Sequence, residues 1–240
     1  PMTRLLAAVS LTACAAAIPT AAQAQGRSAP RTELATADVN PVAQRQVRRD
    51  VVFAATMPAA GDTLVIPASS ESDIATRGAA LDAATREAVA RAIAAAKFKF
   101  GARAMLSLRG IGAWDRIVVI GLGENADLAA VQAVGAAGGR ALMTEDGRVT
   151  VAAEGLSAEQ IGELAIGMGI GEYRSDIHRT VDRPSAELGA TTIVASTAPS
   201  AEAAFRSRGT AIVDAVHWTR DLSNEPANII YPESFVEHTR

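Results

Sequence analysis

Short runs of apolar and β-branched residues recur along the chain, and each run is bounded by Gly, Pro, Asp or Asn. Runs of this length and composition are typical of β-strands. They lie at residues 50–56, 63–67, 102–108, 116–120, 149–153 and 191–195. The pattern therefore predicts a sheet assembled from segments spread over most of the chain.

Between these runs the apolar residues recur with a helical period. Residues 81–96 place their apolar side chains on one face, which predicts an amphipathic helix. A second helix is predicted over 127–142. A third begins at Ser157, because Ser157 and Gln160 have the spacing of a capping box. Strands that alternate with helices predict an α/β fold in which helices flank the sheet.

The connections between strands indicate how the sheet is built. The runs at 50–56 and 63–67 are too close for a crossover helix, and so are the runs at 102–108 and 116–120. Parallel neighbours need such a crossover, whereas antiparallel neighbours do not. We therefore expect two adjacent antiparallel pairs and a mixed sheet.

A long helix is predicted over about 200–222. Its main apolar stripe consists of Phe205, Gly209, Ile212 and Val216. Trp218 and Leu222 point elsewhere, so two sides of the helix need burial. Few residues follow Leu222, so we expect the second side to require a body that this chain does not contain.

The first residues have the organisation of a signal peptide. Arg4 is followed by an apolar stretch over 5–18 and by the small-residue exit Ala22-Gln23-Ala24. We expect cleavage after residue 24, export to the periplasm or the medium, and a flexible tether over 25–47. A second route stays open, because Leu11-Thr12-Ala13-Cys14 resembles a lipoprotein cleavage box that would anchor the protein at Cys14.

Composition narrows the function classes. The formal net charge is −3, and loss of Arg4 with the signal would make it −4. This balance and the 4% of aromatic residues argue against nucleic-acid binding. The basic run over 45–49 is interpreted as a solvated linker. Cys14 is the single cysteine of the sequence, so cleavage after residue 24 would exclude disulfides and thiol catalysis.

The sequence Gly121-Leu122-Gly123-Glu124-Asn125-Ala126 follows a predicted strand and resembles a dinucleotide-binding turn. That site needs an acidic residue about 20 positions further on. Glu154, which ends the next strand, lies 28 residues beyond Ala126. A tight strand-to-helix turn that uses glycine is therefore the favoured interpretation.

Metal and charge motifs are sparse. The three histidines, His178, His217 and His238, show no paired spacing. His217 and Asp221 lie four residues apart and could share a metal, but a hydrogen bond on the helix surface is the favoured interpretation. Solvated ion pairs in a loop are expected for Arg174, Asp176, Arg179, Asp182 and Arg183.

The segment 220–228, RDLSNEPAN, reads as a helix end followed by a turn, and residues 232–235, PESF, start another helix. This string resembles the R-D-L-x-N-E-P-A-N segment that opens the catalytic domain of leucyl (cytosol) aminopeptidases. Upstream, 98–101 with 116–123 and 171–176 resemble further landmarks of that family, in the same order. Ser175 stands where an aromatic residue is usual. The resemblance covers about 50–240.

The resemblance implies an accessory N-terminal α/β domain over 48–199, similar to the macro domain, and a connecting helix with the start of the catalytic domain over 200–240. It implies a metallopeptidase that cleaves peptides with two divalent ions, manganese or zinc, and assembles as a homo-hexamer. The ligands and catalytic residues of the family lie downstream of 220–228, so no residue here is assigned as catalytic, metal-binding or cofactor-binding. We expect the chain alone to be inactive and to bind no metal.

Two other classes stay open from the sequence. A macro-like domain could bind ADP-ribose or another nucleotide, with residues 121–125 at the phosphates. Alternatively, the domain could serve only in hexamer assembly. We expect no nucleic-acid partner and no membrane-spanning segment.

Overall fold

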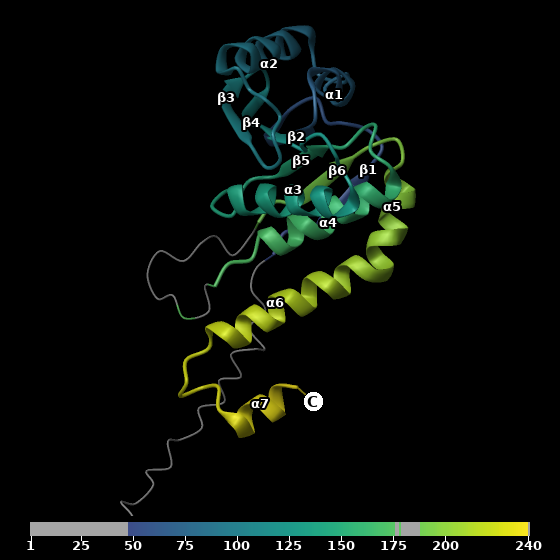
Figure 1. The fold of residues 1–240 in the computed structure, drawn as a ribbon. Coiled ribbons are helices and arrows are strands. Elements are labelled where there is room, and N and C mark those ends of the chain that lie inside the picture. The colour runs from purple at the N-terminus through teal and green to yellow at the C-terminus, as the bar shows by residue number, and fades with distance from the viewer. Residues whose placement is uncertain (1–47, 176–177, 179–187, 240) are drawn as a thin grey trace, which may run out of the picture. The chain divides into compact units, whose positions relative to one another are not determined.

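The computed structural model describes residues 48–175, 178 and 188–239. In this part of the chain six strands form one sheet in the order β1-β6-β5-β2-β4-β3 (Figure 1). The strands are β1 (Val51–Ala54), β2 (Gly61–Ala68), β3 (Met105–Ile111), β4 (Trp114–Gly121), β5 (Val149–Ala152) and β6 (Thr191–Val194). Each of the six predicted strands is confirmed, with ends shifted by a few residues.

The mixed sheet is confirmed, but one of the two expected strand pairs is wrong. Strand β3 pairs antiparallel with β4, as the short connection predicted. Strand β1 does not pair with β2; it pairs parallel with β6, and β6 and β5 separate it from β2. The remaining pairs, β2 with β4, β2 with β5 and β5 with β6, are parallel. A short connection excluded a helical crossover, but it did not exclude a loop that passes to a more distant strand.

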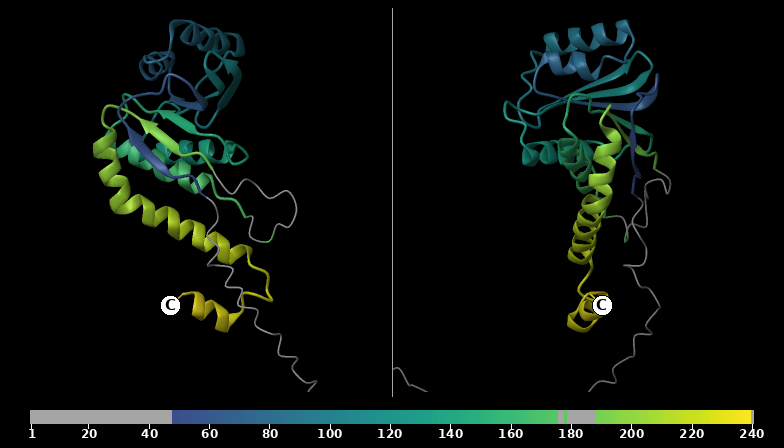
Figure 2. Two further views of the ribbon diagram at one scale, coloured as in Figure 1. Left: turned by 180° about the vertical axis from the view of Figure 1, so that it is seen from behind. Right: turned by 90° about the vertical axis from the view of Figure 1, so that its right-hand side faces the viewer.

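Helices cover both faces of the sheet. The helices are α1 (Glu71–Arg77), α2 (Ala83–Ala96), α3 (Leu128–Ala141), α4 (Ala158–Gly171), α5 (Ala198–Ala204), α6 (Thr210–Asn224) and α7 (Pro232–His238), with a π-helical turn η2 (Phe205–Gly209) between α5 and α6. Helices α1 and α2 lie on one face, and α3 and α4 lie on the other (Figures 1 and 2). Alternating residues of the central strands serve the two cores: Leu64 and Ile66 face α1 and α2, whereas Val65 faces α3 and α4.

Several helix starts are fixed by polar caps, and the sequence predicted the one at Ser157. Ser157 and Gln160 form the predicted capping box of α4, and Asp127 caps α3. Helix α1 was not predicted. It has seven residues, of which Ile74 and Arg77 are buried, so it offers too few apolar positions for a period. Its Ser70 cap was the one available signal.

Helices α3 and α4 pack closely because glycines face the partner backbone. A Cβ at Gly167 would overlap the carbonyl oxygen of Gln132 on α3, and a Cβ at Gly171 would overlap that of Ala136. By contrast, a Cβ at Gly162, also on α4, would meet nothing within 4 Å. Glycine at the first two positions therefore sets the separation of the two helices.

Helices α5 and α6 are continuous through η2, which adds one residue to the helix. The buried stripe consists of Phe205, Gly209, Val213 and His217. The predicted stripe is correct up to η2 and wrong beyond it, since Ile212 and Val216 are only partly buried. In a regular helix of 3.6 residues per turn, residues 212 and 216 follow Phe205 on one face. One residue absorbed in a π-turn moves that face forward to 213 and 217.

The expectations for the N-terminal part of the chain can be compared with the structure only in part. The basic run over 45–49 is not a solvated linker at its end, because Arg49 is buried and donates to the carbonyl oxygens of Glu145, Gly147 and Gly189. The expected signal, lipoprotein box and tether lie outside the described residues. None of the described helices is long and apolar enough to span a membrane.

Candidate functional site: the junction of helices α4 and α6

The C-terminal end of α4 is capped by side chains from α6. The last carbonyl groups of an α-helix lack partners within the helix. His217 Nε2 lies 2.7 Å from the carbonyl oxygen of Gly169, and Arg220 Nη1 donates to that of Ile170 at 2.8 Å. The positive charge of Arg220 also lies favourably at the negative end of the α4 dipole. Helix α6 therefore supplies hydrogen-bond partners for two of the last carbonyl groups of α4.

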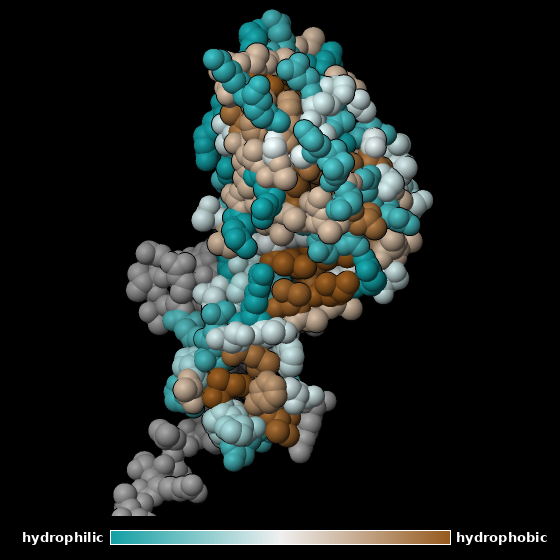
Figure 3. All heavy atoms as spheres, in the orientation of Figure 1, coloured by the Kyte–Doolittle hydropathy of each residue, from teal (hydrophilic) through white to brown (hydrophobic). Residues whose placement is uncertain are grey.

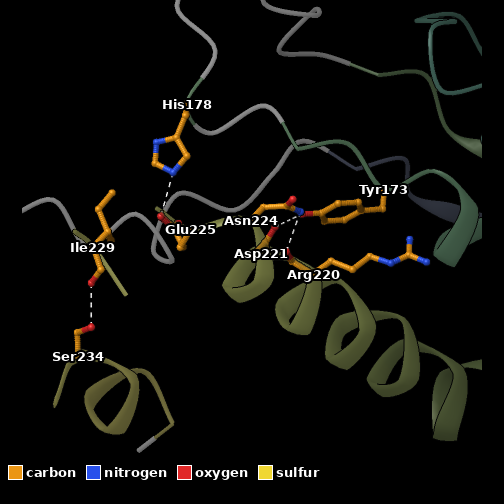
Figure 4. Close-up of polar contacts among 8 residues, drawn as sticks. All are labelled: Tyr173, His178, Arg220, Asp221, Asn224, Glu225, Ile229 and Ser234. Carbon is orange, nitrogen blue, oxygen red and sulfur yellow. Dashed lines mark hydrogen bonds and ion pairs between the residues drawn. The ribbon is translucent and has the colours of Figure 1, made fainter. Parts of the chain in front are cut away.

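Tyr173, two residues after α4, continues this contact (Figure 4). Its hydroxyl donates to Asp221 Oδ1 at 3.0 Å and accepts from Asn224 Nδ2 at 2.9 Å. Its ring lies 5.3 Å from the Arg220 guanidinium and meets the His217 ring edge-on at 5.2 Å. The side chains at 217, 220, 221 and 224 share one helix face, because they are three or four residues apart. We call these four residues and Tyr173 the junction.

Burial shapes the electrostatics of the junction. It lowers the pKa of His217, so the ring is neutral at pH 7, and the bond to Gly169 places its proton on Nε2. Burial raises the pKa of Asp221, while the hydrogen bond from Tyr173 opposes that shift. The pKa of Tyr173 is raised as well, first by burial. The junction thus holds polar groups in a partly desolvated place, where their hydrogen bonds matter most.

The chain turns immediately after the junction. Glu225 is buried, and its Oε2 lies 2.9 Å from His178 Nε2. Its Oε1 has no hydrogen-bond partner within the described part of the chain. The carbonyl oxygen of Pro226 then accepts from the backbone N–H groups of Ile229 and Ile230, at 2.8 and 3.0 Å. Segment 225–230 is therefore an ordered turn between α6 and α7.

Helix α7 carries an apolar surface. Ser234 donates to the carbonyl oxygen of Ile229 at 2.8 Å, a local contact that fixes the helix start. Tyr231, Phe235 and Val236 are 51%, 46% and 48% exposed. Figure 3 shows brown, apolar surface in this region of the molecule. Three large apolar side chains so close together are unusual for a surface with no partner.

The histidines and acidic residues do not gather into a metal site in the described part of the chain. No group of three or more His, Cys, Asp or Glu side chains there could hold a metal ion. The interpretation of His217 and Asp221 as a pair on the helix surface is wrong, since His217 is only 6% exposed and each residue bonds to the α4 end. His178 lies at Glu225, and His238 ends α7.

The expected ion pairs of the charged loop are only partly visible. Arg174 donates to the carbonyl oxygen of Met143 at 2.6 Å and lies 3.9 Å from Asp146. The other members, Asp176, Arg179, Asp182 and Arg183, lie outside the described residues.

The glycine turn after β4 is a tight turn with its donors in use. The N–H groups of Gly121, Leu122 and Gly123 donate to the carbonyl oxygens of Ala104, Ala68 and Phe100, at 2.8, 2.9 and 3.0 Å. Gly123 has a φ of 79°, which favours glycine. These amides are not available to a phosphate.

Carboxylates lie at the same edge of the sheet, one of them at a helix start. Ligands of α/β folds bind at the carboxyl ends of the strands, and anions bind at helix N-termini. Here Asp127 accepts from the N–H of Ala130 at 2.7 Å, and Glu154 accepts from the N–H and the hydroxyl of Ser196 at 2.8 and 2.7 Å. The Ser196 hydroxyl lowers the pKa of Glu154. This edge already contains its own anions, which weighs against a nucleotide site.

A cavity of about 370 Å³ lies between the start of β1 and α6. Arg48, Glu172, Asp214 and His217 are among its lining residues. Burial raises the pKa of Glu172 to about 7, although a hydrogen bond from the Thr191 hydroxyl at 3.0 Å opposes the shift. Arg48 pairs with Asp214 at 2.5 Å across the cavity. Two of the lining charges, Arg48 and Asp214, therefore neutralise one another, and Glu172 is bonded to a residue outside the lining.

The fold and the junction together define a class of protein: an α/β domain followed by a long helix, α6, whose side chains bond to the end of α4. Residues 64–181 match the family model described as the N-terminal domain of the cytosol aminopeptidase family. The chain contains this N-terminal domain of the cytosol (leucyl) aminopeptidase family, as the sequence motifs predicted.

Individual relatives agree with this assignment. A probable cytosol aminopeptidase of Methylorubrum extorquens is 35% identical over 174 residues, which is 68% of this chain and 35% of that protein. The corresponding protein of Dinoroseobacter shibae is 34% identical over 160 residues, 65% of this chain and 31% of that protein. The chain thus spans about a third of the length of these curated relatives.

Solved structures show the same fold. A tomato leucine aminopeptidase mutant superposes with a TM-score of 0.62 at 22% identity, covering 80% of this chain and 42% of that one. The bottromycin maturation enzyme BotP in complex with Mn gives a TM-score of 0.51 at 25% identity, covering 74% and 35%.

Proposed function

We propose that this chain is the N-terminal part of an aminopeptidase that releases N-terminal amino acids from peptides with two divalent metal ions, and that the catalytic residues lie in the segment that follows it in the family. The observation that supports the proposal is the set of contacts in the junction. Its motif residues Arg220, Asp221 and Asn224 bind the α/β domain, so the chain enters segment 225–230 from a fixed place.

Two metal ions suit this chemistry. Such a pair can hold the free amine, polarise the scissile carbonyl and generate hydroxide. Manganese or zinc is proposed as the metal, and the manganese complex of BotP supports divalent metals within similar proteins. The metal would be bound by carboxylates and a lysine downstream, with no ligand supplied by the described residues.

The test compares the 240-residue chain with the same chain joined to its native downstream sequence. Isothermal titration with Mn²⁺ and Zn²⁺ and hydrolysis of leucine amide are measured on both. We expect metal binding and turnover only for the longer protein. Two-metal binding with turnover by the short chain, lost on His217→Ala or Asp221→Ala, would overturn the proposal.

A nucleotide-binding function has less support. It would need free donors near residues 121–125 and at the helix starts of the same sheet edge. Gly121, Leu122 and Gly123 donate internally, and Asp127 and Glu154 occupy the neighbouring positions. A thermal shift with ADP-ribose in the absence of metal would revive this alternative.

We also propose export and hexamer assembly for the whole protein. Export is supported by Arg4, the apolar stretch and Ala22-Gln23-Ala24. Mass spectrometry of the mature amino terminus distinguishes cleavage after Ala24 from lipidation at Cys14 and from an intact start in the cytoplasm. Size-exclusion chromatography with light scattering on the full-length protein tests the hexamer.

A further inference from the structure

The last two turns of α6 are held in a different way from the rest of the helix. Phe205, Gly209 and Val213 pack against the core through apolar contacts. Beyond Val213 the stripe becomes polar, and the attachment depends on hydrogen bonds from the junction residues. Trp218 and Leu222, on other sides of the helix, are only partly buried. The direction in which the chain leaves the domain is therefore set by a few polar groups.

Within the junction, the Tyr173 hydroxyl joins two helix positions at once. It donates to Asp221 and accepts from Asn224, so one bond uses its hydrogen atom and the other uses its oxygen atom. Asn224 is the last residue of α6, and the buried Glu225 follows directly. A single oxygen atom thus fixes the last turn before the chain reverses.

We propose that Tyr173 is a positioning residue, whose hydroxyl fixes the end of α6 and thereby the place from which turn 225–230 and the following segment start. This inference rests on the proposed function, because it assigns a role to the α/β domain within the aminopeptidase. Tyr173 touches neither substrate nor metal in this role. It acts through Asp221 and Asn224 on the backbone that leads to the catalytic segment.

The first experiment uses the 240-residue chain and hydrogen exchange. Tyr173→Phe retains the ring, with its contacts to Arg220 and His217, and removes only the hydroxyl. Because the hydrogen bonds to Asp221 and Asn224 are lost, we expect amide exchange over 220–224 to accelerate roughly ten-fold or more. Exchange in β2 and β4 should stay unchanged, which shows that the domain is folded. Tyr231→Phe, at the other and exposed tyrosine, is the matched control and should change neither.

A double-mutant cycle separates this role from a general loss of packing. Both Tyr173→Phe and Asn224→Ala remove the Tyr173–Asn224 hydrogen bond. Tyr173→Phe also removes the bond to Asp221, and Asn224→Ala also removes the bond from Nδ2 to the Arg220 carbonyl oxygen. Because one bond is shared, the double variant should exchange more slowly than the product of the two single effects predicts. Independent, multiplicative effects would overturn the proposal. So would unchanged exchange over 220–224 in Tyr173→Phe.

The second experiment uses the full-length protein. Tyr173→Phe should lower kcat several-fold and leave KM and metal stoichiometry unchanged, since the metal ligands are untouched and only their placement changes. Normal kcat in a variant whose α6 end exchanges faster would overturn the positioning role. If the unmodified full-length protein releases no amino acid, the proposed function fails, while the exchange result still decides whether Tyr173 holds α6.

Discussion

The centre of the sheet is stabilised by apolar side chains that are buried on both of its faces. The end of α6, by contrast, is attached to the domain by hydrogen bonds to backbone carbonyl groups and to the hydroxyl of one tyrosine. In the first region Leu64, Val65 and Ile66 are nearly or fully inaccessible and contact apolar neighbours on two sides. In the second region Arg220, Asp221 and Asn224 contact the domain mainly through hydrogen bonds. The Arg220 guanidinium also lies over the Tyr173 ring.

These two kinds of contact predict different responses to substitution. Apolar burial spreads its stabilisation over many contacts, so it fails when volume or backbone spacing is wrong. A polar junction depends on alignment, because a hydrogen bond weakens steeply with distance and angle. The core should therefore be sensitive to added atoms, and the junction should be sensitive to rotation of the helix.

The largest effect is expected where α3 and α4 touch. Gly167→Val would force side-chain atoms into the Gln132 carbonyl, which belongs to a backbone and cannot move aside. We expect a loss of about 3 kcal/mol or more in the free energy of unfolding, measured with urea. Gly162→Ala on the same helix is the control. Its Cβ meets nothing within 4 Å, so it should be neutral or stabilise by about 0.5–1 kcal/mol.

The next effect tests the register of α6. Phe205 and His217 are twelve positions apart, which in a regular helix would turn them about 120° from one another. The extra residue in η2 brings them back to within about 20°. An alanine inserted after Ala215 would rotate the junction face by about 100° and should abolish its hydrogen bonds, about 3 kcal/mol locally. Exchange over 217–224 should then approach that of a frayed helix.

Deletion of Ser207 is the matched control for the insertion. Ser207 is exposed, and its hydroxyl bonds only locally, to the Ala204 carbonyl. Without it the helix can become regular, and the junction face keeps its direction. We expect exchange over 217–224 to remain slow. Equal loosening by deletion and insertion would show that register does not control the junction.

These two regions also differ in how far the sequence predicted them. The strands followed from β-branched runs, and the cap of α4 followed from Ser157 and Gln160, because these signals are local. The register beyond η2 was shifted by one residue, since no local pattern marks a π-turn within Phe205–Gly209. The position of β1 was also missed, because strand order depends on the whole sheet.

The junction was only half visible in the sequence. Motifs 171–176 and 220–228 were both noticed, but as separate landmarks. The contact between Tyr173 and Asp221 joins residues 48 positions apart. No periodicity encodes such a pair. The pair forms because α4 and α6 end near each other, which is a property of the folded domain.

A third effect concerns pH at Glu172. Its pKa in the folded protein is about 7, above the ordinary value of 4.5, so folding favours the protonated form. The stability that this group contributes to the folded protein is therefore lost as pH rises from about 4.5 through 7. Glu172→Gln is neutral at every pH and can still accept from Thr191. Relative to this variant, the parent should lose about 3 kcal/mol, or roughly 5–10 °C in Tm, between pH 4.5 and 8.

The comparison of the parent protein with the Glu172→Gln variant isolates the titration of Glu172. His217 titrates with the opposite sign, because its lowered pKa makes stability fall as pH drops below about 6.5. This contribution is common to both proteins and cancels in the difference. Parallel pH curves for the parent and Glu172→Gln would contradict the assignment of a raised pKa.

The smallest effect is expected on α7 in the 240-residue chain. Phe235 is 46% exposed, so Phe235→Ser should change the free energy of unfolding by less than about 0.5 kcal/mol. Val213→Ala, in the buried stripe of α6, is the contrast and should cost roughly 1–3 kcal/mol. In the full-length protein we expect Phe235→Ser to cost about 1–2 kcal/mol, because the following segment would cover its ring. If urea unfolding shows no difference between the short and long proteins at this position, the apolar surface of α7 does not face the following segment.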